Sequence, residues 1–151
     1  MTTRLVPRTA LAALLLFAAN AWAQVPGEKT SGGIVFRIGI ASGEQVSSHP
    51  ADHAEGKMHP SQSGRGRDHL VVSLADERSG KRIEDATVRA SVSRSGLDPV
   101  NRPMERMEAP GATSYGGFFD FRQPGPYRIR VEVTRPGLPM PAVAEFDYRN
   151  R

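Results

Sequence analysis

All four histidines of the chain lie in one polar stretch, HPADHAEGKMHPSQSGRGRDH, which runs from His49 to His69. Apart from Met58, the stretch contains no aliphatic residue larger than alanine. Imidazole nitrogen is a good ligand for copper, zinc, nickel and iron, and thioether sulfur favours Cu(I). These residue types therefore predict a transition-metal site. Its candidate ligands are His49, His53, Met58, His59 and His69.

The spacing of these histidines leaves a second interpretation open. Successive histidines are separated by four, six and ten positions, which matches no fixed ligand template. Histidine-rich tracts are a recognised metal signal, but a flexible segment loses conformational entropy when it closes around an ion. Taken one at a time, His49, His53 and His59 are slightly better explained as residues of a hydrophilic linker. Their clustering favours metal binding for the group.

A second set of soft donors consists of methionines in the later part of the chain. Met104 and Met107 form the segment PMERM, and Met140 lies in GLPMPA. A spacing of three along a strand places two side chains on opposite faces. We therefore expect one of Met104 and Met107 to pack in the core and the other to face outward. Core packing is the usual role of any single methionine.

Other kinds of site chemistry are poorly supported. The chain has no cysteine, so it offers no disulfide, thiolate nucleophile or thiolate metal ligand. It has no Gly-x-Ser-x-Gly segment and no phosphate-binding glycine motif before a helix. The neighbouring carboxylates Glu84 and Asp85 flank a predicted turn, where solvated surface is the expected role. We expect a binding protein rather than an enzyme.

The first 23 residues predict where the protein works. Arg4 and Arg8 precede an apolar run from Ala10 to Ala19, and Ala21-Trp22-Ala23 fits a signal-peptidase site. The apolar run is short for a membrane span, which needs about 20 residues. Cleavage after Ala23 would leave residues 24–151 as one domain. The form of the signal and the absence of cysteine suit a bacterial periplasm.

Charge argues against a nucleic-acid partner. The formal net charge of the whole chain is +4, and removal of Arg4 and Arg8 with the signal peptide lowers it to +2. Nucleic-acid binding requires a clustered basic surface. The segment SGRGRDH adds only Arg65 and Arg67 to a predicted loop.

The elements that must position the candidate ligands are strands. Alternation of apolar and polar residues predicts strands in four segments, and two further segments show the pattern less regularly. The regular segments are 69–76, 86–92, 127–133 and 143–148, and the less regular ones are MERME and YGGFFDF. Between them lie the turn compositions DERSGKR, RSGLDPVNRP, APGAT, RQPGP and RPGLP. Residues 41–68 are poor in apolar side chains and predict a long flexible loop.

About seven short strands without a helical pattern predict an all-β fold, an immunoglobulin-like antiparallel β-sandwich. A partly open β-barrel is the competing architecture. Tyr127 opens a late strand directly after a turn, the place of a tyrosine corner, in which the hydroxyl bonds back to the chain. The alternative is that Tyr127 is simply the first core residue of its strand.

The segment PMERMEAPGATSYGGFFDFRQPGPYRIRVEVTRPG resembles the second half of the periplasmic iron-transport sandwich proteins. That family has a Pro-Met element, a Met-x6-His-Tyr-Gly segment and a Gly-x-Tyr strand followed by a turn that contains proline. The likeness covers about residues 69–137. It implies an immunoglobulin-like sandwich that binds divalent metal, copper included, at a dimer interface beside an iron permease.

Carried over residue by residue, the resemblance leaves an incomplete set of metal ligands. His69 and Met107 fall on a ligand histidine and the ligand methionine. Val71 replaces a glutamate, Ser114 replaces a second histidine, and no histidine follows Tyr127. Two ligands make a poor site for a tetrahedral metal. Either the sandwich has lost its metal, or residues of the histidine-containing loop replace the missing ligands.

These observations together predict a periplasmic protein that binds or traffics a transition metal. Copper is the first candidate, zinc or iron the next, and a protein without any cofactor stays open. The expected partners are a metal ion, a membrane transporter and a second copy of the chain. The alternative function is a non-metal interaction module that offers loops or an edge strand to a membrane or transport complex. A structural domain without a ligand is the third candidate.

Overall fold

The computed structural model describes residues 27–41, 67–109 and 112–150. The predicted signal peptide lies outside the described residues, as do residues 42–66 of the predicted loop. His49, His53, Met58 and His59 fall in that second segment. In the part of the chain that the structure describes, no helix is long and apolar enough to cross a membrane.

The described residues form eight antiparallel β-strands, in agreement with the all-β prediction. They are β1 (Gly27–Ser31), β2 (Ile34–Ala41), β3 (Asp68–Asp76), β4 (Thr87–Arg94), β5 (Val100–Ala109), β6 (Ala112–Phe119), β7 (Gly125–Thr134) and β8 (Ala142–Asn150). The count is one more than the seven expected.

Two of the predicted loop boundaries were wrong. Ala41 and Asp68, expected to bound the long loop, belong to β2 and β3, because Ala41 pairs with His69 and Asp68 with Phe119. The segment VNRP, expected in a turn, is the first half of β5. Pairing with β4 outweighs its turn composition, and Pro103 is tolerated because this half of β5 is bonded to β4 alone.

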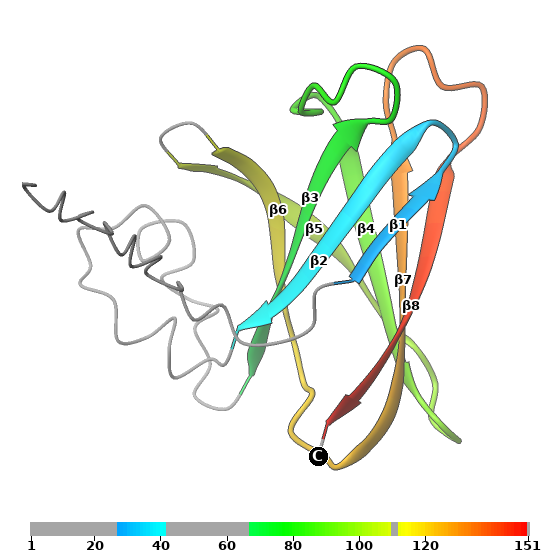
Figure 1. Ribbon diagram of the computed structural model, residues 1–151. Helices are drawn as coiled ribbons and strands as arrows, with labels where there is room; N and C mark the ends of the chain where they lie inside the picture. The colour runs from blue at the N-terminus through cyan, green and yellow to red at the C-terminus, as the bar shows by residue number, and fades with distance from the viewer. Residues whose placement is uncertain (1–26, 42–66, 110–111, 151) are drawn as a thin grey trace, which may run out of the picture.

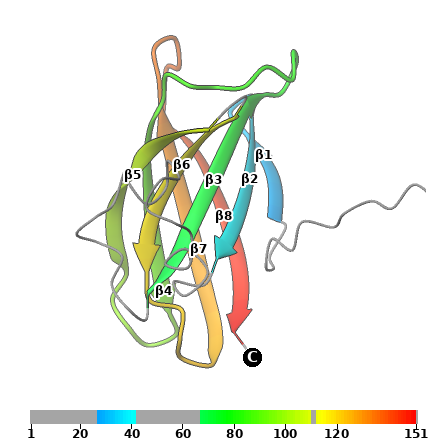
Figure 2. The ribbon, with the colours of Figure 1, turned by 90° about the vertical axis from the view of Figure 1, so that its left-hand side faces the viewer.

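The strand order is β1-β2-β3-β6-β5-β4-β7-β8 (Figures 1 and 2). β5 belongs to both sheets, since its residues up to Met104 pair with β4 and those from Glu105 onward pair with β6. At the opposite edges β1 and β8 approach closely. A Cβ atom added to Gly27 would lie 2.7 Å from the ring of Phe146. The sheet is therefore a sandwich nearly closed into a barrel, and each of the two architectures considered describes part of it.

The core lies between the two sheets and is built from the alternate residues that the sequence pattern indicated. The inward side chains of β3, β4, β7 and β8 are buried, and they include Leu70, Val72, Leu74, Val88, Val92, Ile129, Val131, Val133, Ala144 and Phe146. β6 adds Tyr115, whose hydroxyl donates to the carbonyl of Ile83 at 3.3 Å and accepts from the amide of Ala86 at 3.2 Å. The core thus fixes which face of each strand points outward.

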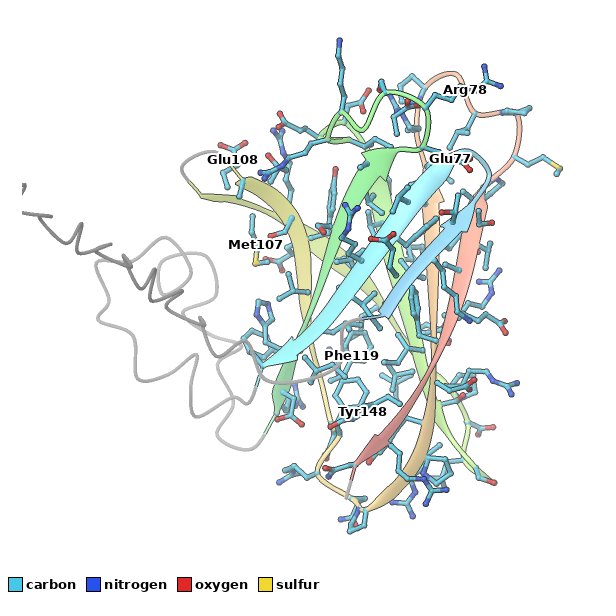
Figure 3. The ribbon with its side chains drawn as sticks, in the orientation of Figure 1. Glu77, Arg78, Met107, Glu108, Phe119 and Tyr148 are labelled. Atoms are coloured by element: carbon cyan, nitrogen blue, oxygen red, sulfur yellow. The ribbon has the colours of Figure 1, made fainter. Side chains whose placement is uncertain are left out.

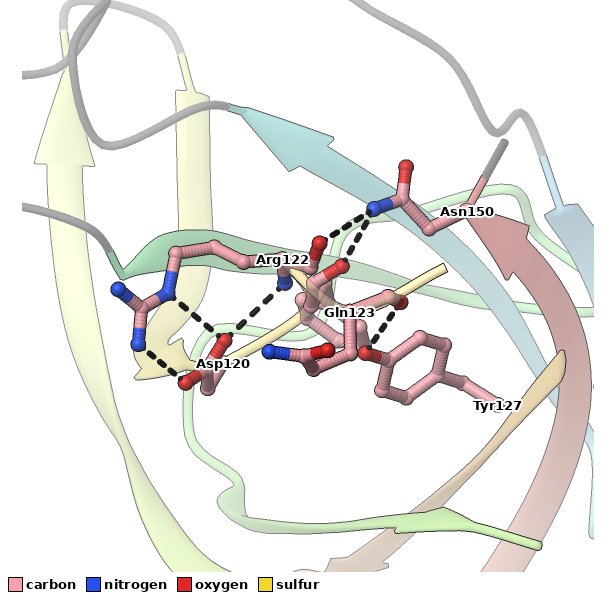
Figure 4. A network of polar contacts seen from close by, with 6 residues as sticks. Asp120, Arg122, Gln123, Tyr127 and Asn150 are labelled. Atoms are coloured by element: carbon pink, nitrogen blue, oxygen red, sulfur yellow. Dashed lines mark hydrogen bonds and ion pairs between the residues drawn. The ribbon is translucent and has the colours of Figure 1, made fainter. Parts of the chain in front are cut away.

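A polar network closes the turn between β6 and β7 (Figure 4). The Tyr127 hydroxyl donates to the carbonyl of Gln123 at 2.8 Å, the backward bond of a tyrosine corner. The Asn150 side-chain amide donates to the carbonyl of Phe121 at 2.8 Å. Of the two interpretations of Tyr127, the tyrosine corner is confirmed, and the ring is also part of the core.

Candidate metal site

His69 is the second residue of β3 and lies on the face opposite to the core residue Leu70. The alternation of β3 predicts an outward side chain, yet only 2% of His69 is exposed. Its cross-strand neighbour on β6 is Phe118. The two rings stack with centroids 4.7 Å apart and an interplanar angle of 28°. His69 is therefore held in place on the outer face of the sheet by an aromatic neighbour.

Met107 lies in the second half of β5, opposite Ser114 of β6. It shares the outer face with His69, and Figure 3 shows it on the side of the β5–β6 ribbons away from Phe119 and Tyr148. The prediction for the methionine pair is confirmed in its geometry. Met104 packs in the core, while Met107 faces away from it. Met107 is nonetheless only 4% exposed, so the outward methionine is also buried.

Gly116 of β6 brings His69 and Met107 together. A Cβ atom at Gly116 would lie 2.5 Å from Nε2 of His69 and 2.7 Å from Sδ of Met107. The two donor atoms lie near one point in space and so cannot be further apart than the sum of these distances, about 5.2 Å. An alanine in place of the glycine would put a methyl group where the donors converge. Because Gly116 has no side chain, the donor atoms of His69 and Met107 can occupy this space.

The register of three strands explains this convergence. Gly116 pairs with Val71 of β3 on one side and with Glu105 of β5 on the other. His69 lies two residues before Val71 and Met107 two residues after Glu105, so both reach Gly116 along diagonals. Side chains two residues apart on a strand share a face. The outer face around Gly116 therefore also carries Val71 and Glu105.

Glu105 is a neighbour of the pair that the sequence did not indicate, and it lies beside Gly116 without belonging to the two converging donors. The resemblance placed the missing carboxylate at position 71, where this chain has valine. The structure places an exposed glutamate on the opposite flank of the same glycine. The two-residue spacing from Met107 indicates a shared face, but only the register shows that Glu105 borders Gly116.

Three other carboxylates, those of Asp68, Glu84 and Asp85, interact with groups outside the His69–Met107 pair. Asp68 precedes His69 and faces the other side of β3. Burial, and then the charge of Asp68, raises the pKa of Tyr148. Glu84 lies within 4.0 Å of Arg106 as an exposed ion pair, and Asp85 lies within 3.4 Å of the half-buried Arg135. Glu84 and Asp85 therefore pair with arginines rather than with His69 or Met107.

Among the described residues, the other candidates do not join the pair. Met140 is 74% exposed in the segment between β7 and β8. Ser114, where the resemblance implied a second histidine, is the cross-strand partner of Met107. Within residues 27–41, 67–109 and 112–150, no group of three or more His, Cys, Asp or Glu is placed to hold a metal. The structure thus unites His69 and Met107, and the histidines of residues 42–66 lie outside what it describes.

Comparison with known proteins supports this fold. No protein-family model matches the chain, and no curated protein matches it in sequence. A copper-bound variant of FetP from uropathogenic Escherichia coli has a TM-score of 0.62 at 11% identity, over 82% of this chain and 93% of that one. The copper-reconstituted P19 protein of Campylobacter jejuni gives 0.62 at 10%, over 83% and 93%.

A third solved structure, a DUF4426 family protein from Pseudomonas aeruginosa, has a TM-score of 0.64 at 16% identity, over 83% of this chain and 94% of that one. At these identities the likeness shows a common fold. The resemblance found in the sequence is therefore confirmed as a structural one.

Proposed function

We propose that this chain is a periplasmic protein that binds and hands on a transition metal, with copper as the first candidate. The observation that carries the proposal is the convergence of His69 and Met107 above Gly116. Imidazole nitrogen and thioether sulfur are both good copper ligands. Two structures of the same fold, FetP and the P19 protein, contain copper, and FetP was recombinantly expressed in the periplasm of E. coli.

The surroundings of the pair fit a site that binds rather than reacts. Both donors are buried, and the stack on Phe118 restricts the His69 ring. A fixed imidazole loses little entropy when it takes a metal, which favours affinity. The role proposed is metal handling without catalysis.

Several parts of the proposal concern residues and partners beyond the described structure. Imidazoles of His49, His53 and His59, with the sulfur of Met58, would complete the coordination of an ion held by His69 and Met107. A membrane transporter and a second copy of the chain are the proposed partners. Zinc or iron would replace copper if the loop supplied most of the ligands. The fold is proposed to be immunoglobulin-like, which the two packed sheets and the tyrosine corner support.

Metal analysis of untagged protein, followed by competition titrations with Cu(I), Cu(II) and Zn(II), tests this function. Met107→Leu conserves side-chain volume and removes the sulfur, so it should weaken copper binding with little loss of stability. Met140→Leu is the matched control, because Met140 is exposed and distant from the pair in the chain. Protein that binds no metal more tightly than about 1 mM, roughly 4 kcal/mol, would refute the function.

A further inference from the structure

We propose that the His69–Met107 pair is selective for a monovalent soft ion, Cu(I) or its analogue Ag(I), over Cu(II) and Zn(II). The inference rests on the proposed metal-binding function and specifies its substrate. It follows from three features of the described residues: the types of the two donor atoms, their burial, and the weakly coordinating side chains that pair beside them.

The donor types come first. Met107 supplies a neutral thioether, which is a soft ligand that selects Cu(I), whereas Zn(II) prefers imidazole, thiolate and carboxylate. Zn(II) sites in proteins commonly use four ligands, while Cu(I) is stable with fewer. In the part of the chain that the structure describes, His69 belongs to no cluster of three His, Cys, Asp or Glu. One imidazole and one thioether therefore suit the ion of lower coordination number.

The burial of the two donors also favours a monovalent ion. His69 is 2% exposed and Met107 is 4% exposed, so an ion between them is largely removed from water. The electrostatic cost of taking an ion out of water grows with the square of its charge, which makes a divalent ion about four times as costly as a monovalent one. Neither donor carries a negative charge that would offset this cost. A neutral, buried pair of donors therefore favours a monovalent ion over a divalent one.

The residues next to the two donors on the outer face do not supply strong ligands that would offset the cost of burying a divalent ion. Val71 pairs with Gly116, and Ser114 pairs with Met107, so an apolar and a hydroxyl residue occupy the outer face beside the two donors. Neither is a strong ligand for a divalent ion. Glu105 is a carboxylate on this face, but its exposure to water screens its attraction for an ion at the pair. If Glu105 did coordinate, the site would prefer a divalent ion, so Glu105 is the residue that tests the inference.

The experiment uses protein in which His49, His53 and His59 are replaced by alanine, so that His69 is the sole remaining imidazole. Ag(I), Zn(II) and Cu(II) are titrated in turn, with the methionine methyl groups labelled for NMR. We expect Ag(I) to bind about 100-fold more tightly than Zn(II). It should shift one methyl resonance, and that resonance should be missing from the spectrum of Met107→Leu.

Two controls separate this inference from the proposed function. Glu105→Gln should leave the Ag(I) affinity unchanged within about twofold, because the carboxylate is not a ligand for the monovalent ion. Zn(II) or Cu(II) affinity within about tenfold of that for Ag(I) would overturn the selectivity while leaving metal binding intact. Loss of that divalent binding in Glu105→Gln would identify a carboxylate site instead. Failure of the wild-type chain to bind any of the ions would refute the function itself, and the selectivity with it.

Discussion

Substitution of Gly116 by alanine tests whether copper affinity depends on the candidate site or on the stability of the sheet. The added Cβ would lie 2.5 Å from Nε2 of His69 and 2.7 Å from both Sδ and Cε of Met107. Contacts this short force a side chain to move. Met107 can rotate away, whereas the stack on Phe118 restrains the His69 ring. We therefore expect Gly116→Ala to drive the sulfur away from the imidazole and to weaken copper binding by at least about tenfold, which corresponds to 1.4 kcal/mol.

Gly117→Ala is the matched control on the opposite face of the same strand. Its Cβ would lie 2.9 Å from Sδ of Met104, which packs in the core. Overpacking costs about 1–3 kcal/mol, and reduced chain entropy in the unfolded state returns about 0.4–1 kcal/mol. Both variants should therefore lose up to about 2.5 kcal/mol of unfolding free energy in urea titrations.

Only Gly116→Ala should also lose metal affinity. Equal copper affinity in Gly116→Ala and the wild type would refute the convergence of His69 and Met107 as the basis of binding. If Gly117→Ala weakened copper binding as much as Gly116→Ala does, copper affinity would depend on the stability of the fold rather than on the geometry of the site.

Three further predictions concern other parts of the chain. Tyr127→Phe removes the hydrogen bond to the carbonyl of Gln123 and should lower the free energy of unfolding by about 1 kcal/mol in urea; an unchanged midpoint would contradict the tyrosine corner. Hydrogen bonds from Arg122 lower the pKa of Asp120 below its ordinary value of 3.8. The charged carboxylate therefore stabilises the fold above that value, and this effect is lost as the pH falls through the lower pKa of the folded state. Asp120→Asn should therefore cost at most about 1 kcal/mol at pH 6, since the pair is half exposed, and the difference should vanish in strong acid; a difference that grew on acidification would contradict this sign. Mass spectrometry of the protein from its native host should give Gln24 as the first residue, and retained Met1 would contradict export.

The sequence by itself determined the strands and the chemistry of the donors. Period-two alternation follows directly from strand geometry, so it was enough to predict the inward faces of β3, β4, β7 and β8. The spacing of Met104 and Met107 was enough to place them on opposite faces. The limits of the predicted loop and the first half of β5 were less well predicted, because pairing with distant strands outweighs local turn composition.

The tertiary structure alone decided that His69 and Met107 meet. They are 38 positions apart in the sequence, and they converge because β3, β6 and β5 pair in a register that places both beside Gly116. No local pattern contains that register, since it is set by the packing of the whole sheet. The same register buries His69 although it lies on the outer face of β3, and it places Glu105 beside Gly116. Residue type thus specified which ligands were available, and long-range strand pairing specified which of them share a site.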